Sequence, residues 1–242
     1  MAFQYLDTHS ILERESLDRG NQLRVELLEL GLPPEEFDKV FNQKLDFIYA
    51  RLPVEFWEGD VPPRVPRALV RELQVYLSNC MKVKRYGLGL SLISPRFDSK
   101  TSALYYLCRE LIVKGYSCFT SSFRQFIFLL RESRDDATLK EEITERLRAN
   151  FFFLLDVPEA DDLPAYLKPD LLARLELRLL GGQAILFSAE TGVSSLNELS
   201  SNSLLSDVLI PFARVNKLVS VTDNTDLDLL YKDRWELVNG TN

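Results

Sequence analysis

Two runs of helically spaced apolar residues open the chain. In the first run, Ser10 and Glu13 have the spacing of a capping box, and leucines follow up to Gly31, which predicts a helix that ends at the glycine. The second run begins at Pro33 and repeats apolar residues every three or four positions, which predicts an amphipathic helix. The two helices either form a hairpin packed on their own domain or form a module that docks onto a partner. The residues expected to contact such a partner are Phe37, Val40, Phe41 and Phe47.

The stretch from residue 52 to residue 66 breaks this pattern. It is rich in proline, which fixes φ and removes backbone donors, so a continuous helix or a central strand is disfavoured. We therefore expect a linker over residues 52–66 between an N-terminal helical segment, residues 1–51, and a main domain, residues 67–242. Phe56 and Trp57 lie inside the linker, and we expect both rings to pack on the main domain because they would otherwise expose apolar surface.

From residue 67 onward, short apolar runs alternate with helical patterns. The apolar runs predict strands near 88–93, 116–120, 151–155, 184–187 and 218–221. Helices are predicted near 67–80, 101–114, 122–131, 139–148 and 169–180, with a further helix closing the chain. Continuously apolar strands separated by helices are typical of a parallel sheet buried on both faces. The predicted fold class is therefore α/β, a parallel sheet flanked by helices, with a short N-terminal helical segment.

Charge is spread so that no single field dominates the molecule. The chain has 29 Lys and Arg against 36 Asp and Glu, a net charge of −7, which does not draw the whole protein toward nucleic acid or an anionic membrane. Any contact with DNA must be local. Two local basic clusters stand out, one on the predicted helix after the linker and one in the loop that follows it, and either forms a solvated face or contacts a phosphate backbone. Their members are Arg64, Arg67 and Arg71, and Lys82, Lys84 and Arg85.

The cysteines and the single histidine add little chemistry. Cys80, Cys108 and Cys118 lack metal-type spacing, and no charged and then apolar leader opens the sequence, so we expect reduced, buried thiols in a cytoplasmic protein without a metal site. The apolar runs are too short to span a bilayer, so no membrane contact is expected. His9 lies in a polar stretch without a catalytic companion.

A degenerate phosphate-loop motif follows the first predicted strand. Residues 94–101 read SPRFDSKT, which occupies the frame G-x-x-x-x-G-K-[ST] between a strand and a helix. In that motif backbone N–H groups surround the phosphates, the lysine neutralises them and the hydroxyl binds magnesium. Only Lys100 and Thr101 keep signature residues. A Lys-Thr pair alone carries little information, and its position between strand and helix is what gives it weight.

In this context the chain resembles the DnaC/IstB-type helicase-loader AAA+ ATPases. The resemblance begins with the aromatic linker, runs through YGLGLSLISPRFDSKTSALYYLCRELIVKGYSCFTSSFRQFIFLLRES, and continues in FFFLLDVPEA, QAILFSAE and KDRWELV. It covers about residues 52–238 in order and spacing more than in identities. The resemblance implies a P-loop NTPase (AAA+-like) domain over residues 67–242 and a relic nucleotide site at Lys100, Thr101 and Asp156, with Asp156 as the magnesium-orienting acid.

The departures from the family pattern bear on activity. Phe97 and Ser99 stand where the family has glycines, and Asp98 adds a carboxylate where a polyphosphate would lie. Val157 stands where a second acid would activate the attacking water. The expected arginine finger falls near residues 206–207, which are Ser and Asp. Loss of such a finger alone costs about 10³- to 10⁵-fold in rate.

These departures favour a pseudo-ATPase without a bound cofactor. The expected function is that of a catalytically degenerate scaffold or adaptor, acting through protein contacts with a replicative helicase, a transposase or another ring ATPase. Lys100 would then face solvent or pair with Asp156 or Asp98 in an empty site. Two alternatives stay open: an active ATP-dependent helicase loader that binds ATP or ADP with magnesium through an atypical loop, and a DNA-binding replication accessory that uses the basic clusters.

Overall fold

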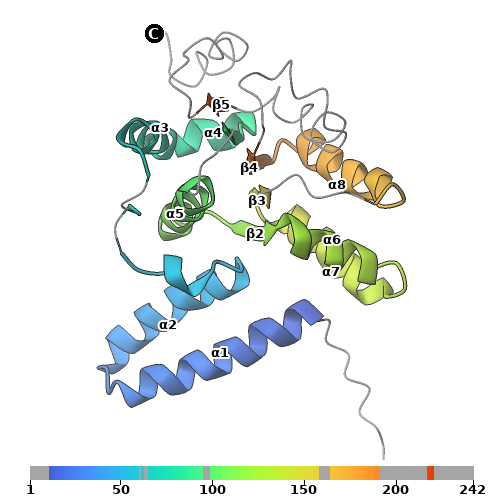
Figure 1. The fold of residues 1–242 in the computed structure, drawn as a ribbon. Coiled ribbons are helices and arrows are strands. Elements are labelled where there is room, and N and C mark those ends of the chain that lie inside the picture. Colours follow the sequence, from blue (N-terminus) through green and yellow to red (C-terminus); the bar gives the residue numbers. More distant parts are fainter. Residues whose placement is uncertain are drawn as a thin grey trace, which may run out of the picture.

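The computed structural model describes residues 11–59, 61–62, 65–94, 99–157, 164–190 and 217–220. An α-helical hairpin lies beside an α/β domain in which helices cover a central sheet (Figure 1). The chain passes from the hairpin to the domain through the predicted linker. The predicted closing helix, His9 and Arg64 lie outside the described residues.

The hairpin consists of α1 (Ile11–Glu29) and α2 (Pro34–Tyr49), as the apolar spacing predicts. Gly31 adopts φ 63°, a left-handed conformation that lets the chain turn between the helices. Leu23, Leu27 and Ile48 form the buried centre of the hairpin. Partly buried side chains surround this centre: Leu32, Phe37, Val40, Phe41 and Trp57.

The sheet has five strands in the order β2-β3-β4-β1-β5, and each pairing is parallel. The strands are β1 (Leu90–Ser94), β2 (Cys118–Ser122), β3 (Phe152–Val157), β4 (Ala184–Glu190) and β5 (Lys217–Ser220). This confirms the predicted parallel sheet, and each strand overlaps its predicted range. Because the strands are parallel, their carboxyl ends lie along one edge of the sheet and their amino ends along the other.

Six helices of the main domain are described. They are α3 (Arg67–Ser78), α4 (Cys80–Tyr86), α5 (Ser99–Val113), α6 (Phe123–Glu132), α7 (Ala137–Ala149) and α8 (Lys168–Leu180). The helix predicted over 67–80 is α3, and a second helix, α4, follows it where a loop was predicted. Asn79 leaves helical geometry at φ −103° and ψ 15°, and its side-chain amide donates to the Val75 carbonyl, which ends α3. Lys82, Lys84 and Arg85 therefore lie on a helix and not in the predicted loop.

Strand residues alternate between two apolar layers. Phe152 and Leu154 face the layer that contains α3, α4 and α5. Phe153, Leu155 and Val157 face the layer that contains α6, α7 and α8. All six residues of β3 are buried, which is why this strand reads as continuously apolar in the sequence. By this alternation Asp156 belongs to the α5 side of the sheet and Val157 to the opposite side.

The linker packs on the main domain through Phe56, as predicted, whereas Trp57 packs on the hairpin. It contains a short 3-10 helix, η1 (Val54–Phe56). The Phe56 ring stacks on Tyr105 of α5 with centroids 5.1 Å apart. The Trp57 ring packs against Phe47 at 6.0 Å, and its indole N–H donates to the Leu52 carbonyl at 2.8 Å.

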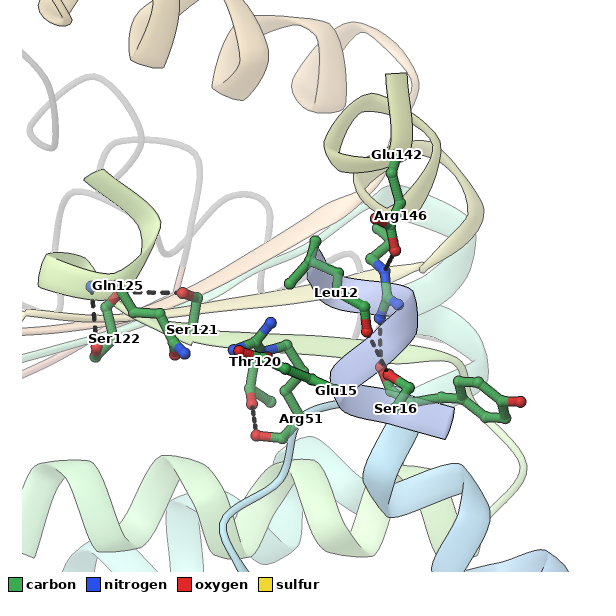
Figure 2. A network of polar contacts seen from close by, with 11 residues as sticks. Leu12, Glu15, Ser16, Arg51, Thr120, Ser121, Ser122, Gln125, Glu142 and Arg146 are labelled. Carbon is green, nitrogen blue, oxygen red and sulfur yellow. Dashed lines mark hydrogen bonds and ion pairs between the residues drawn. The ribbon is translucent and has the colours of Figure 1, made fainter. Parts of the chain in front are cut away.

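The hairpin is tied to the outer edge of β2 and to α7 (Figure 2). Leu12 of α1 is 1% exposed and belongs to the α6–α8 apolar layer. Arg51 forms an ion pair with Glu15 of α1 at 3.0 Å. Thr120 of β2 donates its backbone N–H to the Ala50 carbonyl and its hydroxyl to the Arg51 carbonyl, both at 2.8 Å. The structure therefore packs the hairpin on its own domain, and a separate role of residues 1–51 in docking stays a prediction.

Two further expectations concern buried thiols and membranes. Cys80, Cys108 and Cys118 are buried and not linked in a disulfide, as expected. Within the described ranges, no helix combines the length and the apolar character that crossing a bilayer requires.

Candidate nucleotide site

The motif lies where a phosphate loop belongs, between the end of β1 and the start of α5. β1 ends at Ser94 and α5 begins at Ser99, so the strand and the helix flank the motif as predicted. Residues 95–98, which include Phe97 and Asp98, lie outside the described residues. The site can therefore be built from the first turn of α5 and from the carboxyl ends of β3 and β4.

Side chains from two elements, α5 and β4, surround Asp156 of β3. The Thr101 hydroxyl, in the first turn of α5, donates to Oδ1 of Asp156 at 2.9 Å. Ser188 pairs in register with Asp156 across β3 and β4, and its hydroxyl donates to the same oxygen. Lys100 is only 2% exposed and its positive charge acts on Asp156. The structure thus brings together Lys100, Thr101 and Asp156, the three residues that the sequence assigned to a relic site, and adds Ser188.

The carboxylate of Asp156 is held by opposing effects. Burial raises its pKa above the ordinary value, because the charged form loses water. The hydrogen bonds from Ser188 and Thr101 and the charge of Lys100 oppose this rise. Burial raises the pKa of the neighbouring Tyr105 phenol as well, and the negative charge of Asp156 adds to that rise. The polar groups at this edge therefore satisfy one another inside the protein.

Val157 occupies the position next to Asp156 and is fully buried. Its side chain belongs to the α6–α8 apolar layer, on the face of the sheet opposite Asp156. Its backbone N–H donates to the Ser188 hydroxyl at 3.3 Å. An apolar, enclosed side chain cannot orient or activate a water molecule.

The residues present fit a magnesium nucleotide only in part. Lys100, Thr101 and Asp156 are of the types that contact phosphate and magnesium. In this structure Thr101 and Ser188 already occupy one Asp156 oxygen with hydrogen bonds. Val157 supplies no acid at the position next to Asp156.

The hairpin residues assigned to partner contact lie mainly inside the protein. Phe37, Val40 and Phe41 pack within the hairpin, where the Phe37 and Phe41 rings stack at 5.8 Å. Phe47 is 2% exposed and packs in the α3–α5 layer. A contact role for these four side chains stays a prediction, and their position shows that they first hold the hairpin together.

An exposed apolar face of the hairpin was missed by the sequence reasoning. Leu17, Val25 and Leu28 of α1 are 46%, 56% and 62% exposed. Helical geometry places them within one arc, on a different side of α1 from the buried Leu23 and Leu27. The sequence does contain a sign of this face, because Leu17, Val25 and Leu28 do not share the helical spacing of the buried Leu23 and Leu27.

The basic residues form two separate groups. Arg67 and Arg71 are exposed in the first half of α3. Lys82, Lys84 and Arg85 are exposed on α4, which follows α3 and leads to the amino end of β1. The structure does not test whether either group contacts nucleic acid.

Comparisons with known proteins identify the fold. No protein-family model matches the chain, and no curated protein matches its sequence. Among solved structures, the DnaC helicase loader superposes with a TM-score of 0.57 and 14% identity over 70% of this chain and 100% of that one. The DnaI structure gives a TM-score of 0.54 and 15% identity over 70% and 94%. AMPPCP-bound DnaA from Aquifex aeolicus gives 0.52 and 16% over 76% and 56%, so the chain spans about half of that structure.

These likenesses establish the fold. The chain has the α/β fold of AAA+ P-loop proteins, in the arrangement seen in helicase loaders and replication initiators. At these identities the likeness does not extend to activity or partners.

Proposed function

We propose that this chain is a catalytically degenerate AAA+ protein that acts as a scaffold or adaptor for a replicative helicase. A transposase or another ring ATPase is the alternative partner of the same class. The observation that carries the proposal is Val157, because it is enclosed in an apolar layer at the position where hydrolysis needs an acid. The fold then retains its shape and surfaces without turnover.

The closed network around Asp156 supports the same conclusion. In a working site the lysine, the hydroxyl and the acid are held ready for the phosphates and the metal ion. Here Thr101 and Ser188 both donate to Asp156, and Lys100 lies enclosed beside it. The sequence adds Phe97 and Ser99 in place of the loop glycines. Several losses together argue against turnover more strongly than any single one.

The exposed face of α1 supports a protein partner. Leu17, Val25 and Leu28 present apolar surface to solvent, although the opposite face of the same helix is already buried. A helix that is apolar on both sides fits between its own domain and a second protein. The helicase is the favoured occupant because the structural neighbour DnaC is a helicase loader.

Nucleotide assays test the degenerate part of the proposal. We expect no magnesium-dependent ATP hydrolysis above background. Millimolar Mg-ATP should leave the melting temperature unchanged within about 1 °C, since 1 kcal/mol of binding linkage would move a domain of this size by roughly 2–4 °C. A shift of several degrees that disappears in Lys100→Ala would contradict the proposal and favour an active, ATP-dependent loader.

Binding to the helicase of the same organism tests the adaptor part. Replacing Leu17, Val25 and Leu28 by serine should weaken binding to the purified helicase ring at least about tenfold, because an apolar contact of about 1.4 kcal/mol or more is lost. The matched control replaces other exposed apolar side chains, Val113, Leu177 and Leu180, by serine. Equal affinity of the two triple variants would contradict docking through α1, and unchanged melting curves exclude misfolding as the cause of a loss. The transposase and a second ring ATPase serve as further test partners.

A further inference from the structure

The turns that lead into the parallel strands meet at the amino edge of the sheet, opposite the candidate nucleotide site. Gly87 precedes β1 and Gly182 precedes β4, and a Cβ on Gly87 would lie 2.4 Å from the Gly182 carbonyl oxygen. Lys84 of α4 places its ammonium 5.8 Å from the Tyr116 ring and 5.7 Å from the Phe151 ring, which precede β2 and β3. The end of α4 therefore joins the starts of several strands into one surface.

The described turns that lead into β1, β2, β3 and β4 carry no acidic residue. The sequence holds no Asp or Glu between 72 and 98, between 110 and 132, between 145 and 156, or between 176 and 190. The segment that leads into β5 likewise has none between 207 and 223. At the carboxyl edge, by contrast, Asp156 is the next-to-last residue of β3 and Glu190 is the last residue of β4. Although the net charge of the chain is −7, the turns at the amino edge of the sheet carry no acid, whereas acids lie at the carboxyl ends of β3 and β4.

The cations of this surface are available to a ligand. Lys82, Lys84 and Arg85 are exposed, and none of them is paired with a carboxylate within the described part of the chain. Lys114 is exposed, directly follows α5, and lies two residues before Tyr116, whose ring contacts Lys84. Four cations thus gather around one helix, on chain segments that the sequence leaves without acids.

Aromatic side chains lie among these cations. Tyr86 is 47% exposed, and the guanidinium of Arg85 lies 5.8 Å from its ring centroid. Tyr116 and Phe151 are half-buried below Lys84. Ring faces beside exposed cations suit a ligand that offers both phosphates and unstacked bases. A duplex offers the phosphates but keeps its bases stacked inside.

We propose that this amino-edge surface binds single-stranded nucleic acid. Lys82, Lys84, Arg85 and Lys114 contact the phosphates, and Tyr86 stacks on a base. Tyr116 forms the floor of the surface. The surface is independent of the nucleotide site, which lies at the opposite edge of the sheet, and of the α1 face proposed for the helicase.

Fluorescence anisotropy with a labelled single strand of about 16 nucleotides tests the cations. The variant Lys82→Gln/Lys84→Gln/Arg85→Gln should lose at least about tenfold in affinity, and its salt slope between about 50 and 200 mM should fall by about 2, since three phosphate contacts are removed. The matched control, Lys39→Gln/Arg131→Gln/Lys140→Gln, removes the same charge from exposed positions elsewhere. Equal losses in both variants, or no binding by the unaltered protein at low salt, would overturn the proposal.

Tyr86 separates stacking from charge. Tyr86→Ala should weaken binding about tenfold with an unchanged salt slope, whereas Tyr86→Phe should bind like the unaltered protein. Parallel titrations with DNA and RNA strands identify the nucleic acid. A duplex bound as tightly as the single strand, an unaltered affinity in Tyr86→Ala, or binding to anionic phosphatidylserine vesicles without binding to oligonucleotides would each overturn the proposal.

Discussion

The two edges of the sheet use charge in opposite ways. At the carboxyl edge Lys100 and Asp156 are 2% and 4% exposed, and the polar groups there bond to one another. At the amino edge Lys84 and Arg85 face solvent, and Lys84 lies over the rings of Tyr116 and Phe151 at the starts of β2 and β3. Enclosed charges must be satisfied within the fold, whereas exposed charges stay free for a ligand. The described charged residues of the relic site, at the edge expected to bind nucleotide, are enclosed, whereas the cations of α4 at the opposite edge face solvent.

The backbone at the starts of β3 and β4, below the amino edge, is held by Arg178 of α8. This side chain is 2% exposed and donates to the carbonyl oxygens of Leu147, Asn150, Phe151 and Ala184. These carbonyls belong to the end of α7 and to the starts of β3 and β4. Burial lowers the pKa of Arg178 to about 9, because the enclosed guanidinium loses the water that stabilises its charge. One buried cation therefore fixes the backbone beneath the exposed ones.

Arg178→Ala should have the largest effect on stability. It leaves several buried carbonyls without a donor and opens a cavity, which should lower the free energy of unfolding by about 3–5 kcal/mol. Thermal unfolding should show a fall in melting temperature of roughly 10 °C. The control Arg148→Ala removes an exposed ion pair with Glu145 and should change stability by less than about 0.5 kcal/mol. If both variants lost a similar free energy of unfolding, the buried Arg178 would contribute no more to stability than an exposed arginine.

Gly87→Ala should come next. Gly87 has φ 60° and its added Cβ would meet the Gly182 backbone, so strain and overlap together should cost about 3 kcal/mol. Gly115→Ala is the matched control, since Gly115 has φ 83° but open space around it, and it should cost only about 1 kcal/mol. Denaturant unfolding of the two variants measures the difference. Equal costs would mean that the two turns are not in close contact.

Lys100→Met tests the closed network at the other edge. Without the ammonium, the Asp156 carboxylate is buried with hydrogen bonds alone, and the free energy of unfolding near pH 7.5 should fall by about 2 kcal/mol. The pKa of Asp156 in the folded state should rise further, so the folded state binds its proton more tightly than the unfolded state. The Lys100→Met variant then loses stability as the pH rises from the carboxyl pKa of the unfolded state through the higher pKa of Asp156 in the folded state.

The deficit of Lys100→Met should therefore be smaller near pH 5 than near pH 7.5. Chemical unfolding at both pH values measures it. Lys100→Met/Asp156→Asn is the control, because it has no carboxylate to titrate and should show a deficit that does not change with pH. A deficit of Lys100→Met that is equal at both pH values would show that Lys100 and Asp156 are not coupled.

Lys84→Ala should have the smallest effect on stability. Its contacts with the Tyr116 and Phe151 rings lie at an exposed site and contribute about 0.5–1 kcal/mol. Differential scanning calorimetry against Lys82→Ala, which lacks a ring contact among the described residues, measures this difference. A loss as large as that of Lys100→Met would mean that the amino-edge cations belong to the core and are not free for a ligand.

The sequence predicted the sheet well because its strands are buried on both faces. A short, continuously apolar run such as 151–155, flanked by helical patterns, fits a central strand better than an amphipathic helix or a half-exposed strand. The relic site was predictable for a related reason. A strand, a loop with Lys100 and Thr101, and an acid that ends another strand must meet at the same edge of a parallel sheet.

Other features depend on tertiary contacts that periodicity does not encode. The helix α4 was predicted as a loop, because its seven residues are too few to show a clear helical period in the sequence. Val157 was read as a missing acid, but its place in the α6–α8 layer follows only from the strand alternation in the folded sheet. The role of Arg178 could not be inferred, because its acceptors lie on three other segments of the chain. The exposed apolar residues of α1 were not predicted as a surface. The buried apolar residues alone were enough to predict the helix, so the remaining apolar positions received no separate interpretation.

The backbone pairing of residues 50–51 with β2 bears on self-association. β2 is the last strand on its side of the sheet, and an uncovered edge strand is a template for pairing with another chain. Ala50 and Arg51 accept the backbone and hydroxyl groups of Thr120, and Arg51 turns the chain there with φ 59°. The protein thus shields its own strand edge with the end of the hairpin. A shortened domain without residues 1–51 would expose this edge together with the surface left by Leu12, and it should aggregate through strand pairing instead of persisting as a smaller monomer.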